Sequence, residues 1–228
     1  MKLNLHFHNR SSAALPKTGR SPPLACLRST RSRFDVGPVI HGLELIEDFI
    51  SHSAARELAT LIDQSPWQHD PGQRRTQHYG WRYDYSERNL TPAPAIPPYL
   101  DAICDLLLRQ KVFGSRPDQM IVNNYETNEG IAPHIDHVPS FGPVVASLSL
   151  LSPCVMSFRQ GSKLGEPNAV LLRPNSLLIL REQARYDWYH EILPAPGSLP
   201  DGTPVTRSRR ISVTFRTVRK VPDPEGLQ

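Results

Sequence analysis

The stretch QMIVNNYETNEGIAPHIDHVPSFGPVVASLSLLSPCVMSF, residues 119–158, decides the fold class. From Met120 onward, short segments rich in β-branched residues are separated by Pro, Gly or Asn, a pattern typical of antiparallel strands. Six such segments follow one another: QMIVNNY (119–125), VVASLSL (144–150), CVMSF (154–158), AVLL (169–172), SLLIL (176–180) and RRISVTFRTV (209–218). Together they predict a β-sandwich or jelly-roll barrel, the double-stranded β-helix.

Two helical segments are expected before these strands. In SHSAARELATLID (51–63) apolar residues recur at i, i+3 and i+4, and either Ser51 or Ser53 can cap the helix. A proline pair opens the second segment, residues 97–113, where proline is tolerated in the first turn. Between the helices, a polar aromatic stretch predicts a loop and a short hairpin-like strand around 81–85. The expected fold is therefore α+β, with two N-terminal helices flanking a jelly-roll core.

The composition fits one ordinary soluble domain. The chain has 228 residues, of which 21% are charged, and no apolar run suits a membrane span or a secretory signal. The three cysteines, Cys26, Cys104 and Cys154, form no CxxC pair, so neither a disulfide framework nor a cysteine zinc site is indicated. We expect a monomer in a reducing compartment, cytoplasmic, or nuclear in a eukaryotic cell.

The net charge of +4 belongs mainly to the N-terminal tail. Residues 1–34 carry seven Lys or Arg and no acidic residue, whereas the rest of the chain has 19 basic and 22 acidic side chains. A basic tail of this kind can bind nucleic acid, stay disordered without a dedicated ligand, or act in targeting. The predicted division is a disordered tail (1–35), one domain (36–222) and a C-terminal tail (223–228).

His134, Asp136 and His190 form the candidate metal site. Residues i and i+2 of an extended segment point the same way, so His134 and Asp136 can bind one metal ion. His190 lies 54 positions after Asp136, in another β segment. Two imidazoles and one carboxylate on a β scaffold are the facial triad of non-haem Fe(II) oxygenases. Because the chain has nine histidines, an HxD pair alone also fits chance.

The segment from Arg210 to Arg216 provides independent support, because it alternates strictly between polar and apolar residues. An exposed strand face would explain the polar half. Two arginines on one face also offer bidentate binding to a dicarboxylate such as 2-oxoglutarate. Asn123 and Tyr125 likewise share one face of the segment just upstream of the HxD pair. The three segments therefore favour a single cosubstrate site.

In this order and spacing, these residues resemble the AlkB family of Fe(II)- and 2-oxoglutarate-dependent dioxygenases, from about residue 40 to 220. The stretches RPDQMIVNNYETNEGIAPHID (116–136) and ARYDWYHEI (184–192) look closest to the AlkB domain of the tRNA wobble-uridine hydroxylases. The resemblance does not extend to the RNA-recognition motif and methyltransferase of those proteins. Val138 departs from the bacterial repair enzyme, which has an acidic residue there; this argues against bacterial-type recognition of an alkylated base.

The resemblance implies a role for each motif residue. The catalytic iron ligands are expected to be His134, Asp136 and His190. Arg210 is expected to pair with the distal carboxylate of 2-oxoglutarate, and Arg216, Asn123 and Tyr125 to contact the rest of it. Ser212 stands where the bacterial enzyme has asparagine, and it is left out of the expected site.

The segment before the second helix carries the candidate substrate residues. Arg74, Arg75, Trp81 and Tyr83 interleave cations with aromatics, a combination that holds phosphates and stacks an unpaired base. The resemblance places them in a nucleotide-recognition lid; alternatively, the aromatics pack this lid onto the barrel. Arg185, five residues before His190, is expected either to line the pocket or to form a plain salt bridge.

The function implied by the resemblance is oxidation of a nucleobase substituent with Fe(II), 2-oxoglutarate and O2. This covers oxidative demethylation of alkylated DNA or RNA, as in DNA repair, and hydroxylation of a modified tRNA base. Two alternatives stay open. The same chemistry can act on a protein or a lipid, since fold does not fix substrate, or the chain can be a non-catalytic nucleic-acid-binding module.

Overall fold

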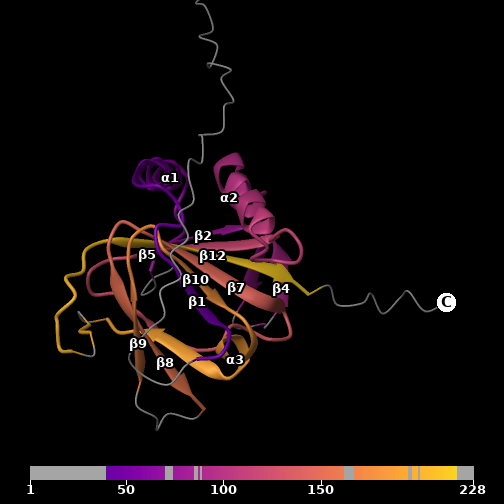
Figure 1. Cartoon of the computed structure of the whole chain (residues 1–228). Coiled ribbons are helices and arrows are strands. Elements are labelled where there is room, and N and C mark those ends of the chain that lie inside the picture. Colours follow the sequence, from indigo (N-terminus) through magenta and orange to yellow (C-terminus); the bar gives the residue numbers. More distant parts are fainter. Residues whose placement is uncertain are drawn as a thin grey trace, which may run out of the picture.

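The computed structural model describes residues 40–69, 74–84, 87, 89–161, 167–194, 197–199 and 201–219. The predicted basic tail and C-terminal tail lie outside these residues, and so does Cys26. The described residues form two antiparallel sheets, one β-hairpin and three helices. Figure 1 shows helices α1 and α2 above the larger sheet and strands β8 and β9 of the smaller sheet below it.

In both sheets most neighbouring strands are far apart in the sequence, as in a β-sandwich. The larger sheet, in the order β1-β10-β7-β12-β5-β2, contains Leu43–Ile46, Leu177–Leu180, Phe141–Leu150, Arg210–Val218, Gln119–Tyr125 and Thr76–Tyr79. The smaller sheet, in the order β6-β11-β8-β9, contains Ile131–His134, Trp188–Ile192, Cys154–Gln160 and Asn168–Leu172. The hairpin pairs β3 (Trp81–Asp84) with β4 (Asn89–Pro92). The predicted jelly-roll class is confirmed, and each of the six predicted strand segments overlaps a strand.

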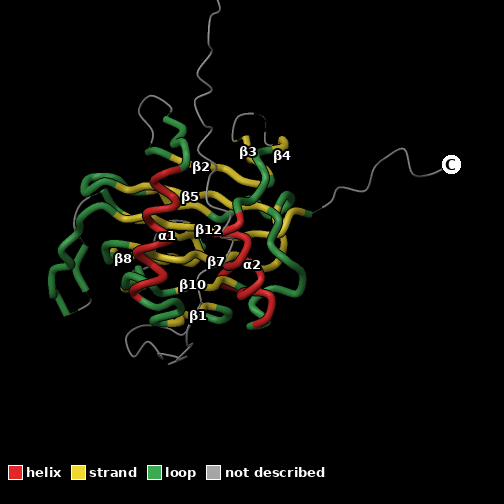
Figure 2. The backbone as a smooth tube through the Cα atoms, turned by 90° about the horizontal axis from the view of Figure 1, so that it is seen from above, coloured by secondary structure: helices red, strands yellow, loops and turns green. Residues whose placement is uncertain are grey.

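The two predicted helices lie across the outer face of the larger sheet (Figure 2). Helix α1 spans His52–Gln64, and of the two candidate caps it is Ser51 whose hydroxyl accepts the Ala54 N–H at 3.2 Å. Helix α2 spans Pro98–Arg109, with the proline in its first turn. Their apolar faces form one hydrophobic core with the sheet, and its fully buried members include Ile62, Leu100, Leu107, Leu148 and Phe215.

Strand β12 separates this core from a second core between the sheets. Its apolar residues Ile211, Val213 and Phe215 belong to the helix-side core. Its polar residues face the other way, toward the smaller sheet, and Arg210 and Arg216 are 1% and 8% exposed. The exposed-face interpretation of this strand is therefore wrong. Alternation here places charged groups inside the sandwich, where they need a partner.

Helix α3, Glu182–Tyr186, was not expected from the sequence. Five residues are too short to show a helical period, and the helix connects β10 of the larger sheet to β11 of the smaller one. Cys104 and Cys154 are both buried, as expected for small apolar side chains, and burial raises the pKa of Cys104 to about 12. Within the described residues, no helix is long and apolar enough to cross a membrane.

Candidate active site

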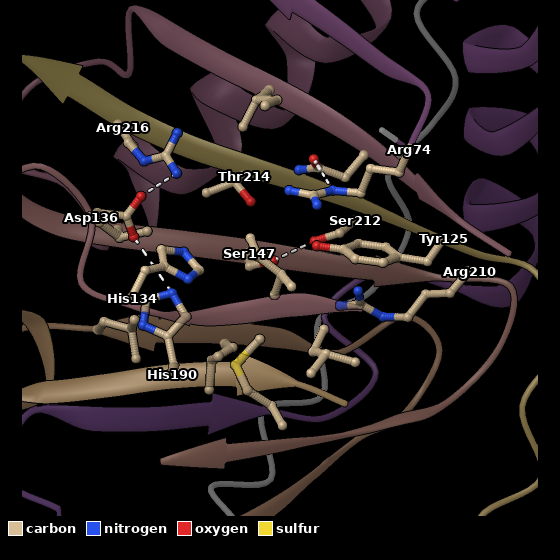
Figure 3. Close-up of a pocket in the computed structure, with 18 residues that line it drawn as sticks. Arg74, Tyr125, His134, Asp136, Ser147, His190, Arg210, Ser212, Thr214 and Arg216 are labelled. Carbon is tan, nitrogen blue, oxygen red and sulfur yellow. Dashed lines mark hydrogen bonds and ion pairs between the residues drawn. The ribbon is translucent and has the colours of Figure 1, made fainter. Parts of the chain in front are cut away.

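A cavity that opens to solvent lies between the two sheets (Figure 3). One part of its wall is apolar: Ile121, Ile131, Val145, Met156, Leu178, Leu180 and Ile192. The rest is polar: Arg74, Asn123, Tyr125, His134, Asp136, Ser147, His190, Arg210, Ser212, Thr214 and Arg216. All the residues that the sequence predicted for metal and cosubstrate binding therefore line one cavity.

Two strands and a loop bring the candidate metal ligands together. His134 ends β6 and is the register partner of His190 in β11, with 4.3 Å between their ring centroids. Asp136 lies two residues beyond β6, and its Oδ2 is 3.7 Å from Nε2 of His190. One ligand atom from each of the three residues lies within 4.8 Å of the other two. Among the described residues, these three side chains form a group that could hold a metal ion. A single ion can contact all three.

The protonation states of these residues suit a divalent cation. Nδ1 of His134 lies 2.8 Å from the Ala132 carbonyl oxygen, so this nitrogen is the donor to the backbone and Nε2 is the one left to face a metal ion. Burial, and then His134, lower the pKa of His190 to about 3, so its imidazole is neutral. Burial raises the pKa of Asp136, but Arg216 and both histidines outweigh it and hold the carboxyl well below its usual range. Two imidazoles and a carboxylate are the donor set that Fe(II) takes in the facial triad.

The two β12 arginines have different surroundings. Nη2 of Arg216 donates to Oδ1 of Asp136, and its Nη1 donates to Gln119 at 3.0 Å. Nη2 of Arg210 donates to the Ser149 hydroxyl at 2.8 Å. Within the described part of the chain, Nε and Nη1 of Arg210 are buried without a hydrogen-bond partner. An anionic group such as a carboxylate can accept from either of these donors, so the residues present fit 2-oxoglutarate.

The polar wall next to Arg210 comes from β5, β7 and β12. The Tyr125 ring lies between Arg210 and Arg74, with guanidinium carbons 5.4 and 5.1 Å from its centroid (Figure 3). The hydroxyls of Ser147 and Ser212 are hydrogen-bonded at 2.8 Å in the middle of the cavity. Ser147 and Thr214 were not singled out from the sequence, although the strict alternation of β12 already places Thr214 on the polar face with Ser212.

The four predicted substrate residues are not brought together. Arg74 lines the cavity, whereas Arg75 donates to Glu126 at 3.0 Å and lies over the Trp67 ring. Trp81 and Tyr83 belong to β3 and are outside the cavity lining. The Tyr83 ring is only 9% exposed, with its centroid 5.0 Å from that of His137 and 5.7 Å from that of Phe141. This packing of Tyr83 agrees with the alternative in which the aromatics pack the lid onto the barrel, and base contact stays a prediction.

Arg185 supports the loop that carries Asp136. It is 2% exposed and lies outside the cavity lining. Its Nη1 donates to the Asp136 carbonyl at 2.8 Å and its Nε to the Gly142 carbonyl at 3.3 Å. Neither of the two roles expected from the sequence describes these backbone hydrogen bonds. The sequence showed only that Arg185 lies near His190. It could not show these hydrogen bonds, because the two partner carbonyls are about 45 residues away along the chain and no local sequence pattern indicates them.

Replacing Arg185 by methionine is expected to weaken metal binding by roughly 10–100-fold, the usual effect of losing an outer support of a metal ligand. Asp136 is not in a strand, so its backbone position depends on this contact. Manganese(II) titration followed by electron paramagnetic resonance measures the affinity. Arg173→Met, which removes an exposed ion pair with Glu47, is the control. Equal manganese affinity in the two variants would contradict the supporting role.

Comparisons with known proteins agree with this geometry. Residues 42–216 match the family model described as the 2OG-Fe(II) oxygenase superfamily. The chain is 36% identical to the uncharacterised protein L905 of Acanthamoeba polyphaga mimivirus, over 79% of this chain and 87% of that protein. It is 32% identical to the tRNA (carboxymethyluridine(34)-5-O)-methyltransferase alkbh8 of Xenopus tropicalis, over 79% of this chain but only 32% of that protein.

The fold also has a counterpart among solved structures. The structure titled OsALKBH1 superposes with a TM-score of 0.57 at 20% identity, and the match covers 86% of this chain and all of that one. At this identity, the likeness supports the fold alone. The matched family region, residues 42–216, contains the metal triad and both β12 arginines.

Proposed function

Because this chain belongs to the AlkB family of Fe(II)- and 2-oxoglutarate-dependent dioxygenases, we propose that it oxidises a substituent of a nucleobase in RNA or DNA. The observation that carries the chemistry is the cavity that joins the metal triad to the Arg210 donors that have no partner among the described residues. The substrate class is inferred from the relatives' names and from the cations and aromatics before the second helix.

We assign the cavity residues as follows. Iron is held by His134, Asp136 and His190; the distal carboxylate of 2-oxoglutarate by Arg210; and the rest of the cosubstrate by Asn123, Tyr125 and Arg216. When bound, iron and 2-oxoglutarate supply the oxidation, in which O2 and 2-oxoglutarate yield succinate and carbon dioxide and a substrate C–H becomes C–OH. If the hydroxylated carbon is an N-methyl group, the product releases formaldehyde and the unmodified base.

The protein's own contribution is orientation and exclusion of water. Arg216 bridges Gln119 and the Asp136 carboxylate, so it holds the anionic ligand in one position and keeps it ionised. The apolar wall formed by Val145, Met156 and Leu178 displaces water beside the cosubstrate. A preorganised, dry site strengthens each polar contact made within it.

The support for a nucleic acid comes from two sources. The frog relative is named for a modified uridine of tRNA, and this chain matches about a third of that protein. In addition, the hairpin strand β3 offers the half-buried Trp81 and the exposed Arg82 beside the cavity-lining strand β5. Aromatic stacking and cationic contacts together suit an unpaired base and its phosphate.

Succinate formation in the presence of candidate substrates tests the proposal. The protein is loaded anaerobically with Fe(II) and 2-oxoglutarate, then exposed to oxygen with tRNA, methylated single-stranded oligonucleotides or no substrate. We expect one nucleic acid to stimulate succinate formation and the stimulation to fall as salt is raised, because phosphate contacts are screened. A protein extract that stimulates turnover where every nucleic acid fails would favour a protein substrate. Salt-sensitive RNA binding without any iron or 2-oxoglutarate binding would favour a non-catalytic module.

A further inference from the structure

The side chains of the neighbouring residues Arg74 and Arg75 point in different directions. Arg74 turns into the cavity wall, where its Nε donates to Oδ1 of Asn123 at 2.9 Å and its Nη1 lies 3.4 Å from the Gly130 carbonyl oxygen. Arg75 turns outward to Glu126 and Trp67. The two side chains therefore serve different sites despite being neighbours in the sequence.

The hydrogen bond from Arg74 fixes which end of the Asn123 amide faces the cavity. A guanidinium only donates hydrogen bonds, so the amide oxygen of Asn123 must be the atom that faces Arg74. The amide nitrogen, with its two N–H donors, is then left for the cavity. Asn123 is 5% exposed and is the register partner of Ser212 in β12, so its side chain has little room to turn over.

This orientation is the one that an anionic cosubstrate needs. A carboxylate only accepts hydrogen bonds, and the opposite amide orientation would place two oxygens against each other. Arg74 also lies over the Tyr125 ring, on which Arg210 lies as well (Figure 3). The contacts of Arg74 thus reach both β5 residues expected to contact 2-oxoglutarate.

We propose that Arg74 is a positioning residue of the cosubstrate site, which presents the Asn123 amide N–H groups and the Tyr125 ring to 2-oxoglutarate. This assignment rests on the proposed use of Asn123 and Tyr125 by the cosubstrate. It replaces the role in phosphate binding that the sequence suggested for Arg74. Arg75 has no part in it, since its guanidinium is paired outside the cavity.

The test is 2-oxoglutarate affinity, measured by anaerobic titration calorimetry on the Fe(II)-loaded full chain without nucleic acid. Arg74→Met is expected to weaken binding by about 10-fold, the equivalent of one hydrogen bond of about 1.4 kcal/mol. Arg75→Met is expected to stay within about twofold of the wild type, because an exposed pair contributes little. Arg74→Gln, which keeps a neutral N–H donor for Asn123, is expected to retain most of the affinity.

A double-mutant cycle with Asn123→Ala separates positioning from direct contact. If Arg74 acts through Asn123, then adding Arg74→Met to Asn123→Ala should weaken 2-oxoglutarate binding by much less than about 10-fold. The remaining loss would come only from the contact of Arg74 with the Tyr125 ring. Fully additive losses, or unchanged affinity in Arg74→Met, would overturn the proposal. So would loss of RNA binding with unchanged 2-oxoglutarate affinity, which would restore the phosphate role. A wild-type protein that fails to bind 2-oxoglutarate would instead refute the proposed function. If Arg74→Met does not fold, the comparison of Arg74→Gln with Arg75→Met carries the test.

Discussion

The variant Arg210→Met is expected to lose 2-oxoglutarate binding while its apo form remains as stable as the wild type or becomes more stable. In the described structure, Nε and Nη1 of Arg210 are buried without partners. Each unsatisfied buried donor costs roughly 1–3 kcal/mol, and an apolar side chain of similar length removes that cost. Among the described residues, the hydrogen bond that is lost is the one to the Ser149 hydroxyl.

Thermal unfolding with and without 2-oxoglutarate measures both parts of this expectation. At 100 times its dissociation constant, the cosubstrate should stabilise the wild type by about 2.7 kcal/mol, whereas Arg210→Met should show no shift. Arg207→Met is the matched control, because Arg207 is also buried but donates to the Leu193 and Glu129 carbonyls at 2.6 Å. That control should lose stability and still respond to 2-oxoglutarate. An apo Arg210→Met destabilised as much as Arg207→Met would mean that Arg210 is structural.

The contrast between these two arginines shows what sequence alone can predict. Arg210 was predicted from the strict alternation of its own strand. This local pattern predicts the face that a residue occupies, because successive side chains of a strand point to opposite faces of the sheet. Arg207 lies in an irregular segment just before β12. Its partners are Leu193, at the start of the same connection after β11, and Glu129, in the distant loop between β5 and β6. A period of two reports which face a residue occupies, but it reports nothing of hydrogen bonds that cross the fold.

The metal triad shows the same limit. The HxD pair is local, and its two side chains were predicted together from their spacing. His190 joins them because β11 pairs with β6 in one register, with His190 opposite His134. Strand pairing is set by packing of the whole sandwich, so the spacing of 54 residues could not show it. His190 was a candidate because it lies in another β segment, and the family resemblance then supported it. Arg74 and Arg75 are a further case, because they precede β2, where no alternation establishes which of them faces inward.

Loss of metal binding is expected in His134→Ala, with little change in the apo fold. His134 ends β6 and is only half-buried, and its side chain makes one local hydrogen bond, to the Ala132 carbonyl. Its removal leaves two ligands, Asp136 and His190, on the cation. Since loss of an outer support already costs roughly 10–100-fold in affinity, loss of a direct ligand should exceed about 100-fold. Succinate formation should fall to background.

Manganese(II) titration and succinate assays on the same preparations measure this effect, and His69→Ala is the control, because His69 is exposed and outside the metal cluster. His134→Ala and Arg210→Met should fail differently. Without a metal, His134→Ala keeps the Arg210 donors but loses the cation that binds the other end of 2-oxoglutarate, so both metal-dependent and cosubstrate-dependent stabilisation should vanish. Arg210→Met should lose cosubstrate binding alone and keep wild-type manganese affinity. If His134→Ala bound manganese as tightly as the wild type, the ion would have to lie elsewhere, and the arrangement of His134, Asp136 and His190 would need a different explanation.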